Sequence, residues 1–366
     1  MSSVVSGWQR TAYEFGKTLI VIAIGLLIGT IIVFFVSDEP RKVYSAILTG
    51  PLPSLSILDD GTWRWRGMSR FGTFLEDSTT LAFVGLAVAL PFRARQFSLG
   101  ADGQLFLGAL ASAAVSIYLP LPGMILLPLA FIAAVLAGFF WGWLPGIMKA
   151  RAGANEIVTT LMLNVIAIQF FIYIVLNVMR DPTAGFIVTH YFQDSAILEP
   201  LLRRTNVTVL VFVAPIVCLA GYFLLARTNI GYEIRTVGHN ANFARQMGMP
   251  VERAVALSMA LGGAVAGMAG FHIANAILKR LPTDFPIGLG FEGIVVALLA
   301  RNDPRLIIPA ALFYGYLRAG AQVMERTTDV SREMVLVVQA IIILLIVSEK
   351  LLPRLGSIFG LRGARS

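Results

Sequence analysis

Two short motifs place a carboxylate between glycines at the start of an apolar run. Residues 99–103 read LGADG and residues 289–293 read LGFEG. Asp102 and Glu292 therefore lie where a short or broken helix would expose its first backbone NH groups. A carboxylate in that place could hold a proton or sodium ion, contact a polar substrate together with Gln104, or cap and shape its own helix. The sequence leaves these possibilities open.

A second polar group begins another apolar segment, in the sequence NEIVTTLMLN of residues 155–164. Its side chains recur at helical spacing, which predicts two rows turned toward the interior of a helix bundle. The rows are Asn155, Thr159 and Met162, and Glu156, Thr160 and Asn164. They could contact a polar substrate or hydrogen-bond neighbouring helices. Asn275, one turn after His272, could face the same interior or pair internally.

Residues for covalent or metal chemistry are few, because the chain has three histidines and one cysteine, Cys218, inside an apolar run. A metal site has no support in this set. Residues 288–293 match GxGxxG without a preceding strand, and the GKT of residues 16–18 lacks the earlier glycine of a phosphate loop. We therefore expect no enzyme and no cofactor in this chain. Any use of ATP must come from a partner subunit.

The composition indicates an integral membrane protein, since 57% of the residues are hydrophobic and only 14% are charged, with a mean hydropathy of +0.78. Soluble domains average roughly 45–50% apolar and about 25% charged residues. The net charge of +8 fits basic cytoplasmic loops better than nucleic-acid binding. We expect one all-α polytopic membrane domain over residues 1–366.

Apolar runs of about 20 residues predict ten transmembrane helices, of which the second and eighth are unusually short. The first follows Arg10 and Lys17 and reads as an uncleaved helix because bulky residues occupy the place of a signal-peptide cleavage site. The predicted spans are 18–36, 76–92, 99–119, 122–148, 155–179, 207–226, 254–278, 287–300, 306–324 and 334–351.

The stretch 227–253 interrupts these apolar runs with four arginines and two glutamates. Charges of this density cannot lie in hydrocarbon, so we expect a structure held at one membrane face. Basic residues in each short inside turn favour cytoplasmic N- and C-termini, which places this loop in the cytoplasm. The segments 37–72 and 181–206 then lie outside. The second is a possible docking surface for an external partner, and the role of the first stays unassigned.

An internal repeat relates the two halves of the chain. The LGADG and LGFEG motifs are separated by five predicted helices, an odd number, so the two copies would enter the membrane from opposite sides. This spacing predicts two inverted five-helix halves joined by the charged loop, a plan common among transporters.

Several stretches resemble the permease subunits of bacterial ABC importers for nucleosides and simple sugars, a group that also includes branched-chain amino acid permeases. They are FSLGADGQLFLGALASA, RAGANEIVTTLMLNVIA, GFEGIVVALLARNDP and the loop GYEIRTVGHNANFARQMGMPVER with the helix that follows it. The resemblance covers roughly residues 80–320. The NExVxTxMLN element is most similar to the nucleoside branch.

The resemblance implies that the loop presents a short helix to a cytoplasmic ATP-binding-cassette ATPase. Asn240 could cap that helix near Ala241, and Phe243, Met247 and Met249 offer apolar contacts. The coupling residues implied are Glu233, Arg235, Gly238, Asn240, Ala244, Arg245 and Gly248.

The resemblance also implies other partners: a second permease subunit, identical or different, an extracytoplasmic substrate-binding protein, and the lipids of the bacterial inner membrane. It predicts import of a nucleoside, purine-type favoured, or a simple sugar by alternating access. The pathway would be lined by Asp102, Gln104, Asn155, Glu156, Thr160, Asn164, Asn275 and Glu292. The alternative is an ion-coupled secondary transporter that uses Asp102 or Glu292.

Overall fold

A computed structural model of the chain describes residues 39–57, 63–202, 204–328, 337 and 340. The chain divides into two compact units, Met1–Leu52 with Leu317–Ser366, and Pro53–Tyr316. In the first unit, helix α2 (Pro40–Leu48) packs against the C-terminal part of α12 (Pro304–Thr327). Gly320 of α12 lies there against the backbone of Ile47. Every site discussed below belongs to the second unit.

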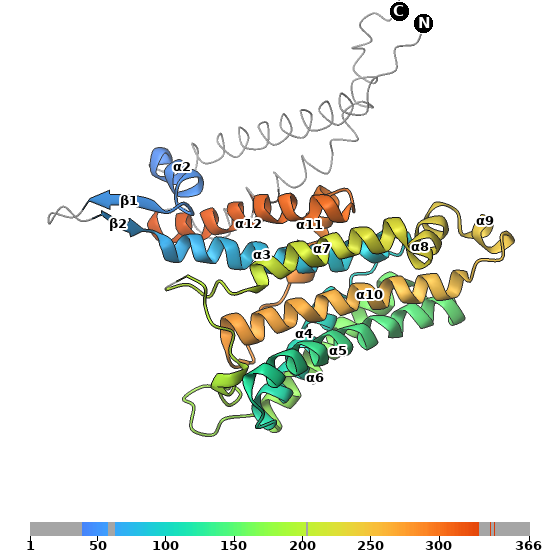
Figure 1. Cartoon of the computed structure of the whole chain (residues 1–366), viewed down its shortest axis with the longest axis horizontal. Helices are drawn as coiled ribbons and strands as arrows, with labels where there is room; N and C mark the ends of the chain where they lie inside the picture. The colour runs from blue at the N-terminus through green and yellow to red at the C-terminus, as the bar shows by residue number, and fades with distance from the viewer. Residues whose placement is uncertain (1–38, 58–62, 203, 329–336, 338–339, 341–366) are drawn as a thin grey trace, which may run out of the picture. The chain divides into compact units, whose positions relative to one another are not determined.

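The second unit is a bundle of helices with one small hairpin (Figure 1). Its two strands, β1 (Ser54–Ile57) and β2 (Trp63–Arg66), pair antiparallel with Ser54 opposite Arg66. The longer helices are α3 (Met68–Arg93), α4 (Ala101–Tyr118), α5 (Gly123–Ala152), α6 (Glu156–Asn177), α7 (Leu210–Arg227), α10 (Val251–Phe271) and the start of α12. The shorter ones are the 3-10 turn η1 (Asp194–Ala196), α8 (Asn229–His239), α9 (Ala241–Gln246), the π-helix η2 (His272–Leu278) and α11 (Leu289–Leu299).

Among the described residues, six helices are long and apolar enough to cross a membrane: α3, α5, α6, α7, α10 with η2, and α12. The predicted spans from 76 to 324 each contain a helix, whereas 18–36 and nearly all of 334–351 lie outside the described residues. The eighth predicted span is short, as expected, because α11 has 11 residues. The chain is thus a multi-pass helical membrane protein.

The prediction that the second span is short and begins at 76 is wrong, because α3 begins at Met68 and has 26 residues. Its polar first turns are partly covered by other parts of the protein. The Glu76 side chain, for example, accepts a hydrogen bond of 2.7 Å from the backbone N of Asn206. A hydropathy profile counts Glu76 as a charged residue, without its partner, and therefore ends the predicted span there.

Helix α10 occupies the interior of the bundle. In its most apolar stretch 83% of the residues are buried, against 22% in α5, α6 and α7, whose apolar side chains lie mainly at the bundle surface. Glycines let α10 approach α5 until their backbones touch: a Cβ on Gly142 of α5 would lie 2.5 Å from Met259 O. Small residues are the usual means of close helix packing in membranes.

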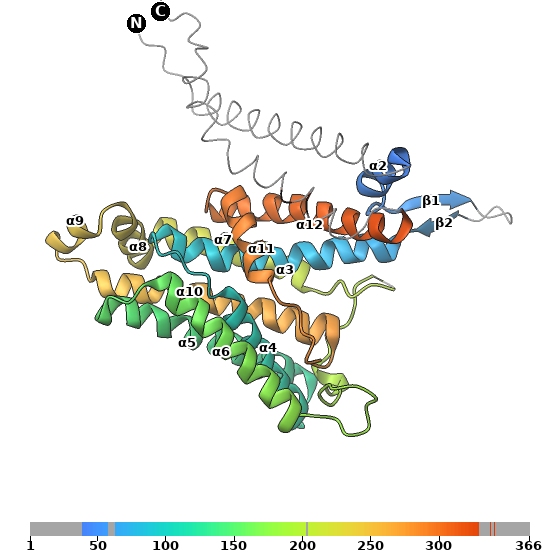
Figure 2. The same ribbon diagram turned by 180° about the vertical axis from the view of Figure 1, so that it is seen from behind.

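The two ends of the bundle differ (Figures 1 and 2). Helices α8 and α9, the charged stretch of the sequence, lie at one end, and the connection between α6 and α7 lies at the other. This connection is bound to the segment that follows η2, because Thr189 N donates to Leu281 O at 3.0 Å and Val188 bridges to Pro282. The single cysteine, Cys218, is buried in α7.

Candidate functional site: a buried helix junction and a charged hairpin

The start of α4 is held by two polar side chains of α6. Leu99 N donates to Thr160 Oγ1 at 3.1 Å, and Gly103 N donates to Asn164 Oδ1 at 2.9 Å. The Asn164 amide nitrogen donates in turn to Leu99 O at 2.7 Å. Both side chains are buried. One row of the NEIVTTLMLN motif therefore satisfies the backbone groups at the N-terminal end of the neighbouring helix.

The start of α11 is held by Asp102 of α4. The Asp102 carboxylate is only 2% exposed, and its Oδ1 accepts a hydrogen bond of 2.7 Å from Gly290 N. The helices meet so closely that a Cβ on Gly290 would lie 2.9 Å from Asp102 N. The two carboxylate motifs of the sequence thus meet at one buried junction, which we call the α4/α11 junction and define by residues 99–103 and 288–293.

The other predicted row on α6 does not turn inward. Asn155 is the cap of α6, because its Oδ1 accepts hydrogen bonds from Ile157 N at 2.9 Å and Val158 N at 3.4 Å. Met162 is 56% exposed. The expectation that this row faces the bundle interior is therefore wrong, since α4 packs along the Glu156, Thr160 and Asn164 side of the helix.

The remaining polar residues lie apart from the junction or at its edge. Glu156 forms an ion pair with Lys149 at 2.8 Å, and Lys149 lies close to residues of α8 and α9. Gln104 is buried beside Gly142 of α5, and Glu292 lies half-buried in the first turn of α11.

Asn275 is fully buried in the π-helix, where its Nδ2 donates to Ser116 Oγ at 2.8 Å and to Ala196 O at 2.9 Å. His272 pairs instead with Thr80, with 3.0 Å between Nδ1 and Oγ1. These two side chains therefore have separate partners and do not form an internal pair.

The charged stretch folds into a helical hairpin, α8 and α9. Thr228 caps α8 through Gly231 N at 3.1 Å, and Asn240 caps α9 through Asn242 N at 3.0 Å and Phe243 N at 3.1 Å. The cap at Asn240 confirms the prediction. A small apolar core attaches the hairpin to the base of α10, formed by Val237, Ala244, Val251, Ala254 and Val255, with Met249 at its edge.

The predicted coupling residues divide between this core and the surface. Ala244 is 0% exposed, and Gly238 lies directly against the backbone of Arg93, so both hold the hairpin in place. Glu233 and Arg235 are half-buried, while Asn240, Arg245 and Gly248 are exposed. Arg245 forms an ion pair with Glu252 at 3.0 Å.

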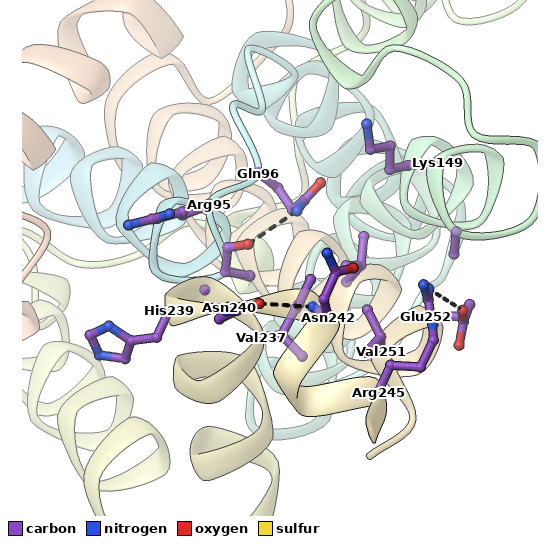
Figure 3. Close-up of a pocket in the computed structure, with 15 residues that line it drawn as sticks. Arg95, Gln96, Lys149, Val237, His239, Asn240, Asn242, Arg245, Val251 and Glu252 are labelled. Atoms are coloured by element: carbon purple, nitrogen blue, oxygen red, sulfur yellow. Dashed lines mark hydrogen bonds and ion pairs between the residues drawn. The ribbon is translucent and has the colours of Figure 1, made fainter. Parts of the chain in front are cut away.

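Two apolar side chains of the hairpin project into solvent, Phe243 at 51% and Met247 at 62% exposed. Beside them is a polar pocket of about 500 Å³. Figure 3 shows it between the hairpin, the turn after α3 and the end of α5. The labelled residues that line it are Arg95, Gln96, Lys149, Val237, His239, Asn240, Asn242, Arg245, Val251 and Glu252.

Comparison with known proteins places these features in a family. Residues 71–347 match the family described as the branched-chain amino acid transport system permease component. The chain belongs to this permease family. Its members are transport components of ABC importers and are not themselves enzymes.

Individual permeases match over nearly the whole chain. The guanosine ABC transporter permease protein NupP of Bacillus subtilis is 33% identical over 90% of this chain and 92% of its own length. The glucose ABC transporter permease protein TsgB13 of Haloferax volcanii is 31% identical over 95% of this chain and 92% of its own. The nucleoside ABC transporter permease protein NupB of Lactococcus lactis is 28% identical over 93% of each.

Sequence reasoning missed some residues that the structure places at these contacts in the permease. The motif glycine Gly290 was visible, but nothing in the sequence showed that its N–H would meet Asp102. Ser116 and Thr80, the partners of Asn275 and His272, look like ordinary small polar residues in apolar runs. Arg93 looked like one more basic residue at a helix end.

Replacing Asn164 by alanine is expected to lower the free energy of unfolding of this permease by about 2–4 kcal/mol, because the buried N–H of Gly103 and the partly buried carbonyl of Leu99 lose their partner. Asn177→Ala on the same helix is the matched control, since Asn177 is exposed and bonds only to Tyr173 O one turn away. Unfolding in detergent, followed by circular dichroism, compares the two. Equal losses of stability would contradict the role given to Asn164.

Proposed function

We propose that the chain forms half of the translocation path of an ATP-driven importer in a bacterial inner membrane. Its substrate is a nucleoside, with purine nucleosides favoured, or a simple sugar. The names of its relatives support this range, because they describe permeases for guanosine, for nucleosides and for glucose. We place both termini and the hairpin α8–α9 in the cytoplasm, and ten helices in two inverted halves.

The observation that carries the proposal is the pair Phe243 and Met247. Both project from a hairpin that is itself anchored by a buried core. Exposed apolar side chains on a rigid, charged support are suited to a protein partner. The partner in this proposal is a cytoplasmic ATP-binding-cassette ATPase. ATP stays on that subunit, and this chain carries no cofactor.

Two further proteins complete the proposed assembly, a second permease subunit, identical or different, and an extracytoplasmic substrate-binding protein. ATP binding by the ATPases moves the hairpins, and the halves of each permease rock around the path. We assign Asp102, Gln104, Thr160, Asn164 and Glu292 to the middle of the path, where they shape the α4/α11 junction. Glu156 and Asn155 belong to the cytoplasmic end and Asn275 to the opposite end.

Uptake by the assembled transporter tests this proposal. The chain is reconstituted in proteoliposomes with its second permease subunit, its ATPase and its binding protein, and uptake of labelled guanosine, glucose and leucine is compared with and without ATP. We expect ATP-dependent uptake of guanosine above that of leucine. Uptake by the purified chain alone under an ion gradient would instead establish a secondary transporter.

Replacing Phe243 and Met247 together by alanine is expected to weaken binding of the ATPase by about tenfold or more, the usual loss when central apolar contacts are truncated. Because both side chains are exposed in the free chain, its melting temperature should not change. Tyr173→Ala, which removes an equally exposed aromatic from α6, is the control. Co-purification with the ATPase measures the effect, and undiminished binding would place the ATPase contact elsewhere.

A further inference from the structure

Arg93, the last residue of α3, joins two parts of the cytoplasmic end that are far apart in sequence. Its Nε donates a hydrogen bond of 2.6 Å to the backbone carbonyl of Asn302, 209 positions later. Asn302 belongs to the short turn between α11 and α12. A guanidinium that binds a backbone carbonyl makes a charge-assisted bond, which is stronger than a neutral one.

The backbone of Arg93 faces the hairpin on its other side. Gly238, near the end of α8, lies so close to the carbonyl of Arg93 that a Cβ at this position would overlap it. Ala94 also lies within 3.2 Å of that Cβ position. No side chain separates α8 from the end of α3, so a displacement of α8 has to move Arg93.

The turn that Arg93 holds is itself fixed to α11. Arg301 and Asn302 both adopt left-handed backbone conformations, with φ of 53° and 55°, and Asn302 N donates to Ala297 O at 2.7 Å. Burial raises the pKa of the neighbouring Asp303 carboxyl, but the bonds and charge of Arg305 and the charge of Arg93 outweigh it and hold this pKa below its ordinary value. Arg93 therefore contacts the turn through a hydrogen bond and through charge.

The other end of α11 is fixed at the α4/α11 junction, where Gly290 N binds Asp102. With 11 residues, α11 is about 16 Å long at 1.5 Å per residue. That length is roughly half of the 30 Å hydrocarbon core of a membrane. Along its sides α11 packs against α3 and α4. It is therefore a short rigid body with one end at Arg93 and the other at a buried carboxylate.

We propose that Arg93 is a positioning residue for transport, which passes the displacement of α8 to α11 and through it to the α4/α11 junction. The inference rests on the proposed function, because it requires a partner that moves α8. Arg93 touches neither substrate nor ATPase in this role. Without the Arg93 side chain, ATP hydrolysis continues but no longer drives substrate movement. The surfaces that bind substrate and the ATPase stay intact.

The experiment measures substrate taken up per ATP hydrolysed by the complete transporter in proteoliposomes. Arg93→Met keeps an unbranched side chain that extends about as far as Nε and removes the guanidinium with its donors and charge. We expect this ratio to fall about tenfold, within the range of typical coupling energies between sites, while ATPase co-purification and hydrolysis stay within about twofold of the unchanged protein. Arg93→Lys keeps a charge and a donor, so its ratio should lie between that of Arg93→Met and that of the unchanged protein.

Arg151→Gln is the matched control, since Arg151 is an exposed cation at the end of α5 and should leave the ratio unchanged. An unchanged ratio in Arg93→Met, or proportional loss of uptake and hydrolysis, overturns the inference. If Arg93→Met does not fold, Arg93→Lys is used in its place. An unchanged ratio of uptake to hydrolysis in Arg93→Lys, or a proportional loss of both, then overturns the inference. Absence of ATP-dependent uptake by the unchanged transporter is a different result, which counts against the proposed function itself.

Discussion

Replacing Gly263 by leucine is expected to leave almost no folded protein in detergent. Gly263 of α10 lies directly against the backbone of Gly138 in α5, and a Cβ at Gly263 would overlap the Gly138 carbonyl. Overpacking of a core costs about 1–3 kcal/mol when side chains can shift, but here the obstructing atoms are backbone. The two helices would have to separate along their length.

Gly185→Leu is the matched control for this substitution. Gly185 lies in the connection between α6 and α7, is exposed, has nothing within 4 Å of its Cβ position and does not need a positive φ. Size-exclusion chromatography and thermal unfolding should show a folded Gly185→Leu protein and almost no folded Gly263→Leu protein. A well-folded Gly263→Leu protein would mean that α5 and α10 do not pack by direct backbone contact.

Replacing Asp102 by alanine is expected to reduce ATP-dependent uptake about tenfold or more, because Gly290 N would be left buried without a partner. Asp102→Asn retains an acceptor oxygen of nearly the same geometry, so uptake should stay within about threefold of the unchanged protein. Asp284→Ala, which removes an exposed carboxylate, should have no effect. Uptake of labelled guanosine in proteoliposomes measures all three variants.

The pair of substitutions at Asp102 also separates the two transport mechanisms considered for this chain. A carboxylate that carries a proton or sodium ion must ionise, and asparagine cannot replace it in that role. If Asp102→Asn were as inactive as Asp102→Ala, while both variants remained folded, the capping role would be refuted and an ion site favoured. The bond from Gly290 N to Asp102 Oδ1 is the physical reason to expect the opposite.

The sequence could predict most of the helices, because most apolar runs are long enough to cross a membrane and are bounded by glycine, proline or charge. The error at the second span has a local cause: the polar first turns of α3 have partners, such as Asn206 for Glu76, and hydropathy counts residues without their partners. The π-helix at His272–Leu278 was not predicted, because an α-helix and a π-helix give the same hydropathy pattern.

The candidate site was predicted as a set of residues but not as an arrangement. The repeated carboxylate motifs indicated Asp102 and the glycines around Glu292. That Asp102 binds the other motif's Gly290 depends on how α4 packs against α11, across 188 positions of sequence. Likewise, helical spacing offered two rows on α6, and only the position of α4 decides that Thr160 and Asn164 face protein while Met162 does not.

The α4/α11 junction has an electrostatic consequence. The aligned peptide dipoles of a helix place about half a positive charge at its N-terminus, and two N-termini, those of α4 and α11, meet beside one carboxylate. Their sum is close to the single negative charge of Asp102. A lone buried anion would carry a large solvation cost, and the two helix N-termini and the bond from Gly290 N offset part of it. The junction therefore places a carboxylate inside the bundle in the position that the helix dipoles favour.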